Sequence, residues 1–167
     1  INRGADKPFT DALKVHFEQA RKLYTERLRP YLLEQNGVTE DDVLAARRGR
    51  ADSATAARVR VFTGDDRLVK TLLLAALAPS VPALRNLTVR RLSALNHGSI
   101  TSPIPGGEVA RVSRKVETWA GQFGEIKFVP GDDAGVSLEL VGVEVDSILA
   151  SAAPLDTPGA REVLVRR

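Results

Sequence analysis

Apolar residues recur along the chain with helical spacing, and the most regular run covers residues 108–123. Its large apolar residues stand three or four positions apart: Val109, Val112, Val116, Trp119 and Phe123. This spacing predicts a helix with one apolar side, because residues three and four positions apart lie on the same helical face. The basic residues Arg111, Arg114 and Lys115 then lie on the rest of the helix surface.

A second helix is predicted over residues 65–77, which are apolar nearly all round and stop before Pro79. A helix without a polar face is buried on several sides, so we expect this one at the centre of the core. Asp65 or Asp66 is expected at its N-terminal cap. A separate helix of small residues is expected just before it, over residues 53–62.

A third helix is predicted over residues 83–95, with Arg90 and Arg91 on its outer side. The residues expected to face inward are all leucines: Leu84, Leu87, Leu92 and Leu95. Residues 99–102 are expected to form a short strand, and the sequence Pro103-Ile104-Pro105-Gly106-Gly107 a rigid turn into the helix at 108.

After the helix at 108–123, residues 125–129 and 136–141 alternate between apolar and polar side chains. Residues 130–135 between them are rich in Gly and Asp, so we predict a β-hairpin with a six-residue connection. Helices followed by a β-ribbon are the layout of a winged helix, in which residues 108–123 take the place of the recognition helix. A last short helix is expected over residues 145–150.

The first 52 residues are expected to form a helical lead-in. A long helix at about residues 10–35 ends at Asn36-Gly37 and is kinked or broken by Pro30. A capping box at Thr39 opens a short helix at about residues 40–46. The predicted fold class is therefore mainly α with a small β-hairpin (α+β), divided into a lead-in (1–52), a winged-helix-like domain (53–150) and an exit segment (151–167) cut within an element.

Composition narrows the function only modestly. The chain has 167 residues, 43% hydrophobic and 27% charged, which is ordinary for a soluble globular protein. A formal net charge of +3 does not by itself indicate nucleic-acid binding, so the positions of the arginines matter more than their number. The chain has no cysteine, as expected in a reducing cytoplasm, and no apolar run long enough to span a membrane. It begins at Ile1 and contains no methionine, from which we expect a segment of a longer protein.

Signatures of catalysis are missing from the sequence. The phosphate-binding pattern Gly-x4-Gly-Lys-Ser/Thr does not occur, and His16 and His97 belong to no triad or metal-ligand spacing. The pairs Asp65-Asp66 and Asp132-Asp133 are explained by a helix cap and a turn. We therefore predict no catalytic, cofactor-binding or metal-binding residue in this segment, and no enzyme activity of its own.

Surface recognition remains, in one of two forms. The first is DNA binding by a basic recognition helix with support from its neighbours, through Arg90, Arg91, Arg111, Arg114, Lys115 and Lys127. The acidic residues Glu125, Asp132 and Asp133 around the hairpin weaken that case. The alternative is a protein-interaction or self-assembly module without DNA contact, with the helix at 10–35 as the interface of a homo-oligomer.

Three stretches resemble a known family: Asp66–Pro79 (DRLVKTLLLAALAP), Leu87–Ser102 (LTVRRLSALNHGSITS) and Trp119-Ala120. The most specific part is Leu95-Asn96-His97-Gly98-Ser99-Ile100 followed by Pro103-Ile104-Pro105-Gly106. Over residues 8–150 the chain resembles an internal region of the PglY-type ATPases of bacterial phage-growth-limitation, or BREX, defence systems. The resemblance implies a cytoplasmic AAA+ ATPase that works with other phage-defence proteins. It also implies that ATP and Mg bind elsewhere in the parent chain, and it assigns no functional residue here.

Overall fold

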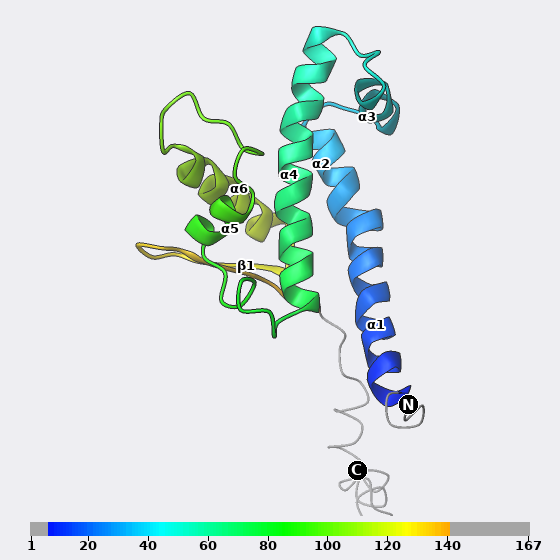
Figure 1. Ribbon diagram of the computed structural model, residues 1–167, viewed down its shortest axis with the longest axis vertical. Coiled ribbons are helices and arrows are strands. Elements are labelled where there is room, and N and C mark those ends of the chain that lie inside the picture. Colours follow the sequence, from blue (N-terminus) through cyan, green and yellow to red (C-terminus); the bar gives the residue numbers. More distant parts are fainter. Residues whose placement is uncertain (1–6, 141–167) are drawn as a thin grey trace, which may run out of the picture.

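The computed structural model describes residues 7–140. The elements in chain order are α1 (Lys7–Leu23), the π-helical turn η1 (Tyr24–Leu28), α2 (Arg29–Gln35), α3 (Glu40–Arg47), α4 (Ser53–Leu77), α5 (Val89–Leu95), α6 (Glu108–Gln122), β1 (Ile126–Val129) and β2 (Gly135–Leu138). The predicted class, mainly α with one small hairpin, is confirmed. Helix α4 lies between the α1–α2 rod on one side and α5, α6 and the hairpin on the other (Figure 1).

The lead-in helix runs without a break from α1 through η1 into α2. Pro30 lies in the first turn of α2, directly after the π turn. The backbone N–H of Arg29 donates to Tyr24 O across this wider turn. A break at Pro30 is therefore not observed, because the π turn takes up the missing N–H of the proline. The helix ends as predicted, with Gly37 at a φ of 59°.

The short helix α3 opens with the predicted capping box. The Thr39 hydroxyl accepts from the Asp42 N–H at 3.2 Å, and the Asp42 carboxylate accepts from the Thr39 N–H at 2.8 Å. These reciprocal bonds satisfy two N–H groups that the first helical turn otherwise leaves without partners.

The prediction of two helices before Pro79 is wrong, because residues 53–77 form the single 25-residue helix α4. Asp52 caps its start by accepting from the Thr55 N–H at 2.9 Å. Gly64 lies inside the helix, where a Cβ atom would stand 2.5 Å from Ser99 O. The glycine therefore serves a close approach between α4 and the 99–100 segment rather than a helix end.

The helix predicted over 83–95 is shorter than expected. α5 starts at Val89, where Thr88 caps it by accepting from the Arg91 N–H at 3.2 Å. Asn86 before it has a φ of 49°, which a continuing helix excludes. Leu95, predicted to face inward, is 45% exposed. The strand expected at 99–102 is absent from the described residues, because that segment packs on Gly64 as irregular chain.

Helix α6 and the hairpin follow the sequence prediction closely. Val112, Val116, Trp119 and Phe123 are buried. β1 pairs antiparallel with β2 in the register Ile126↔Leu138 to Val129↔Gly135. The connection, residues 130–134, is one residue shorter than predicted. Thr88 forms an isolated antiparallel β-bridge with Gly135. From α4 onward the chain therefore contains a helix, this bridge, the helices α5 and α6, and the hairpin. The winged-helix assignment itself stays a prediction, and the expected helix at 145–150 and the exit segment lie outside the described residues.

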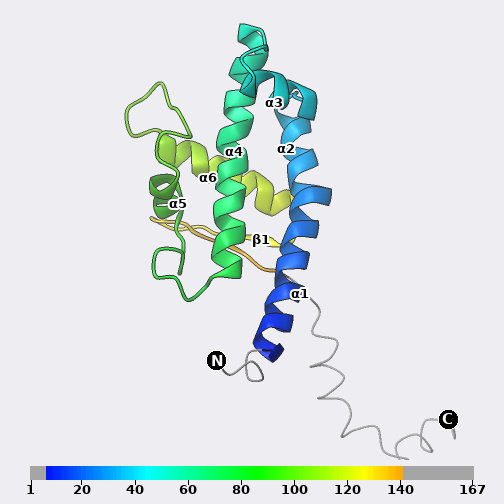
Figure 2. The same ribbon diagram turned by 45° about the vertical axis from the view of Figure 1, so that its right-hand side comes forward.

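One core joins the lead-in to the rest of the chain. The α1–α2 rod lies alongside α4 (Figure 2). Its fully buried side chains come from several helices, among them Leu28, Leu32, Leu68, Leu72, Leu92, Val112 and Val116. The rings of Tyr31 in α2 and Phe123 after α6 meet edge to face, with centroids 5.0 Å apart. The division predicted at residue 52 stays a prediction. Over the described residues, no helix combines the length and apolar character that crossing a membrane requires.

Candidate functional site

The six basic residues predicted to contact nucleic acid divide into two groups. Arg111, Arg114 and Lys115 lie on α6, whereas Arg90 and Arg91 lie on α5 and Lys127 on β1. All are exposed except Lys115, which is partly buried. The two groups have different surroundings, and only the α6 group borders a hollow between helices.

Two hollows flank the contact between α4 and α6. The small hollow, of about 50 Å³, is lined by residues that include Arg60, Asp65, Ser99, Thr101, Arg111 and Lys115. The large hollow, of about 200 Å³, is lined by residues that include Gln35, Asn36, Asp65, Arg114, Lys115 and Thr118. Asp65 and Lys115 line both and form the wall between them. We call Arg60, Arg111, Arg114 and Lys115 the α4–α6 surface.

Lys115 neutralises a buried carboxylate. Its Nζ lies 2.8 Å from Asp65 Oδ2, and the Asp65 side chain is 4% exposed. The Asn36 amide also donates to Oδ2, at 3.3 Å. Asp65 Oδ1 is buried without a hydrogen-bond partner in the described part of the chain. The prediction of a helix cap at Asp65 or Asp66 is wrong, because both residues lie in the interior of α4. The charge of Asp65 is instead satisfied by a residue 50 positions later.

The side chains of Arg111 and Arg114 are exposed on α6. Arg111 Nη1 donates to Thr101 O at 2.6 Å, which orients its guanidinium beside the small hollow. Arg114 has no ion pair with another described residue. Arg60 of α4 borders the same small hollow as Arg111, and it was not among the six predicted contact residues. Its only sequence signal was the Arg58-Val59-Arg60 run, which gives no hint of a neighbour on α6.

The α5 and β1 group is engaged with its own loops. Arg91 donates to Pro82 O at 2.6 Å and to Arg85 O at 3.4 Å, so it fastens the loop before α5. The backbone N–H of Arg90 donates to Asp133 at 3.4 Å, which brings a carboxylate close to this group. Lys127 borders a shallow depression over the hairpin together with Thr88 and Val129. These contacts make the group less suited to anion binding than the α4–α6 surface.

Asp66, the next residue along α4, forms a second buried network. Its carboxylate accepts from Tyr24 Oη and Lys70 Nζ at 2.6 Å each, and from Arg29 at 3.4 Å. Arg29 also donates twice to Glu40 at 2.6 Å, and this pairing raises the pKa of Arg29 and lowers that of Glu40. The network joins η1, α2, α3 and α4, so its role is structural.

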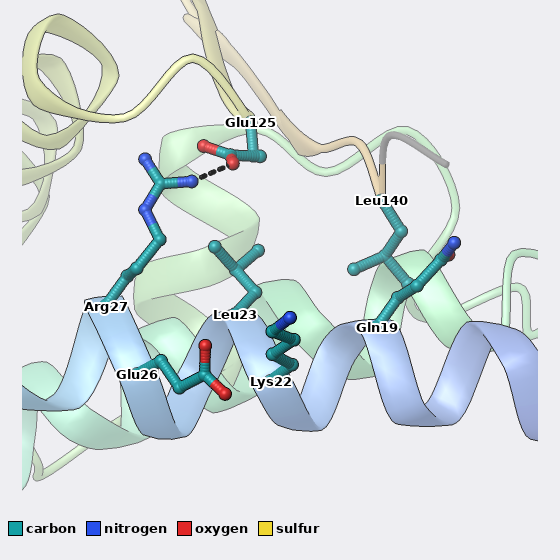
Figure 3. Close-up of a pocket in the computed structure, with 7 residues that line it drawn as sticks. All are labelled: Gln19, Lys22, Leu23, Glu26, Arg27, Glu125 and Leu140. Atoms are coloured by element: carbon teal, nitrogen blue, oxygen red, sulfur yellow. Dashed lines mark hydrogen bonds and ion pairs between the residues drawn. The ribbon is translucent and has the colours of Figure 1, made fainter. Parts of the chain in front are cut away.

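A groove of about 240 Å³ separates the α1–η1 helix from the base of the hairpin (Figure 3). Leu23 and Leu140 give it apolar walls, and an ion pair between Arg27 and Glu125 closes one end (Figure 3). Gln19 Oε1 and Glu125 Oε2 are buried without partners among the described residues. The groove suits contact with another protein segment better than a small charged ligand.

Among the described residues, no group of three or more His, Asp or Glu side chains is placed to hold a metal ion. The family model described as "BREX System ATPase PglY protein 2nd domain" matches residues 1–132. No solved structure matches the chain.

Proposed function

Because the chain belongs to the family of second domains of the BREX system ATPase PglY, we propose that it is a non-catalytic domain through which this phage-defence ATPase contacts DNA. ATP and Mg bind elsewhere in the parent chain in this proposal, since the phosphate-binding pattern does not occur here. The proposed place of action is the cytoplasm, together with other proteins of the defence system. The resemblance noted from the sequence is confirmed by the family match.

The observation that carries the proposal is the charge on the α4–α6 surface. Arg60 and Arg111 come from different helices and border one hollow, and Arg114 lies one turn further along α6. The one carboxylate that lines these hollows, Asp65, is 3% exposed and paired with Lys115. Among the described residues that line these hollows, the exposed charges are therefore positive, and arginine is the side chain best suited to bidentate phosphate contacts.

The order of elements supports a particular way of docking. In a winged helix the third helix presents its exposed face to the major groove while neighbouring elements contact the backbone. Helix α6 occupies that position in the chain, with Arg111 and Arg114 on its exposed face. We propose that α6 approaches DNA and that Arg60 extends the contact along the phosphates.

Charge reversal tests the proposal directly. Fluorescence anisotropy with labelled duplex DNA compares the wild type with Arg111→Glu/Arg114→Glu. The matched control, Arg47→Glu/Arg48→Glu, changes the net charge equally at exposed positions at the end of α3. We expect the α6 variant to lose binding and the control to keep most of it. Equal losses in both variants would contradict a localised site.

A second candidate function, self-assembly, is favoured by exposed apolar residues on α1. Val15 and Phe17 are 56% and 55% exposed, on a helix whose N-terminal part extends past the end of α4 (Figures 1 and 2). Exposed apolar residues that form a contiguous patch often mark contact surfaces, whereas scattered single ones are common on monomers. Mass measurement in solution tests it: a dimer that Phe17→Asp dissociates supports assembly through α1, whereas a monomer at high concentration rejects it.

A further inference from the structure

The connection between α5 and α6 begins with a segment, residues 96–101, that lies along one face of α4. At its start, Asn96 Nδ2 donates to Thr71 Oγ1 at 3.1 Å. Further along, the segment passes so close to α4 that a Cβ atom at Gly64 would stand 2.5 Å from Ser99 O. The segment therefore follows α4 in the antiparallel direction and crosses it at a residue that has no side chain.

Two exposed arginines of α4 flank this crossing point. Arg60 lies four positions before Gly64 and Arg67 three positions after it, so the three residues share one face of the helix. Arg60 borders the small hollow together with Thr101, the last residue of the segment. Seven positions separate the two arginines, which corresponds to about 10 Å along the helix axis.

The segment itself holds two arginine side chains in place. Arg67 Nη1 donates to Ser99 Oγ at 3.0 Å, and Arg111 Nη1 of α6 donates to Thr101 O at 2.6 Å. A guanidinium has five N–H donors, so an arginine that uses one of them here can offer others to a ligand. Side chains that are already held lose less conformational freedom on binding, which favours affinity.

From this arrangement we propose that one strand of duplex DNA crosses the domain over residues 99–101, between Arg60 and Arg111 at one end and Arg67 at the other. The inference rests on the proposed DNA contact and adds Arg67 to it as a phosphate-binding residue. One strand has a phosphate about every 3.4 Å along the DNA axis, so arginines about 10 Å apart reach different phosphates of that strand. The two hydroxyl groups of the segment lie between these arginines and can donate to phosphate oxygens.

The chemistry of this crossing predicts that it is independent of sequence. Arginine and hydroxyl groups that bind phosphates fix the position of a protein on the duplex but carry no base information. The crossing therefore positions α6 on the DNA without selecting a sequence. Removing Arg67 should weaken binding equally for two duplexes of unrelated sequence.

Three variants separate a direct contact from a structural role. Arg67→Ala removes the proposed phosphate contact. Arg58→Ala is the matched control: Arg58 is also an exposed arginine of α4 that donates to a hydroxyl group, Thr55 Oγ1 at 3.1 Å, but it lies nine positions from Arg67 and so on the opposite side of the helix. Ser99→Ala removes the hydroxyl group that holds Arg67 while keeping the arginine and its charge.

The experiment is fluorescence anisotropy with two labelled duplexes of equal length and unrelated sequence, over a range of salt concentrations. We expect Arg67→Ala to bind both duplexes roughly tenfold more weakly than the wild type. The slope of log K against log salt should fall by about 0.9 in this variant. Arg58→Ala should match the wild type, and Ser99→Ala should keep the wild-type slope, because its charges are unchanged.

Other outcomes would overturn the crossing. If the slope of Arg67→Ala equals that of the wild type while Arg111→Glu/Arg114→Glu abolishes binding, the crossing is refuted and the proposed DNA contact stands. Equal losses in Arg67→Ala and Ser99→Ala would show that Arg67 only positions the segment, and equal losses in Arg58→Ala would show a general effect of charge.

A competitor distinguishes a DNA strand from a free polyphosphate, which shares its phosphate chemistry. Displacement of the duplex by tripolyphosphate at constant ionic strength would assign the arginines to a free polyphosphate and overturn the crossing. If no duplex binds at low salt, both the inference and the proposed function are refuted.

Discussion

Lys115 of α6 lies 2.8 Å from Asp65 of α4, and this contact joins two helices across 50 residues of sequence. The Asp65 side chain is 4% exposed and that of Lys115 is 30% exposed. The pair fixes α6 against α4 and holds one cation of the α4–α6 surface inward. Arg60, Arg111 and Arg114 are left to carry the outward positive charge.

Removing the cation from this pair should destabilise the fold. Lys115→Met leaves the Asp65 carboxylate buried without its counter-ion, and we expect a loss of about 2 kcal/mol, below the value for fully buried pairs because Lys115 is partly solvated. Urea denaturation followed by circular dichroism measures it. The double variant Asp65→Leu/Lys115→Met should recover most of the loss. A single variant as stable as the wild type would show that the pair contributes little.

The close packing around Gly64 predicts that replacement by alanine has opposite effects on stability at Gly64 and at Gly121. Gly64→Ala places a Cβ atom 2.5 Å from Ser99 O, so we expect a net loss of about 1–2 kcal/mol despite the better helix propensity of alanine. Gly121→Ala in α6 meets nothing within 4 Å and should stabilise the protein by up to about 1 kcal/mol. Thermal melts of both variants check the pair, and stabilisation by Gly64→Ala would contradict the packing described.

The ion pair between Arg29 and Glu40 predicts how the free energy of unfolding changes at acid pH. The hydrogen bonds from Arg29 hold the pKa of Glu40 below its usual value of 4.5. A depressed folded-state pKa stabilises the protein above the unfolded pKa, and this contribution is lost as the pH falls through the folded pKa. Glu40→Gln should therefore destabilise the protein at pH 7, by less than about 1 kcal/mol since Glu40 is mostly exposed. The difference from wild type should shrink below pH 4.5, and urea titrations across this range measure it. A constant difference from neutral to acid pH would argue against this pair.

Local patterns predicted much of the fold. The apolar spacing of Val112, Val116 and Trp119 defined α6, and the turn residues after Val129 defined the hairpin. Gly64 misled the prediction, because a helix-interior glycine that admits a neighbouring segment has the same sequence signal as a helix end. The start of α5 was missed because the prediction followed the leucine spacing through Asn86, whose positive φ ends any helix before Val89.

The candidate site was predictable only in part. Helical spacing placed Arg111, Arg114 and Lys115 on one helix, but it gave no information about distant residues. Arg60 joins them through the packing of α4 on α6, and Asp65 binds Lys115 through a contact between helices far apart in sequence. Such pairings are a property of the tertiary structure. For this reason the sequence predicted a helix cap at Asp65, where the structure has a buried ion pair with Lys115.

The central claim is that arginines of the α4–α6 surface contact DNA phosphates, and the salt dependence of binding tests it most directly. The measurement is the slope of log K against log salt for duplex DNA, for the wild type and for Arg111→Ala/Arg114→Ala. Each lost phosphate contact on duplex DNA should reduce the slope by about 0.9. A reduction of about 1.8 in the double variant is the predicted result. A slope that is unchanged in the variant would contradict the claim.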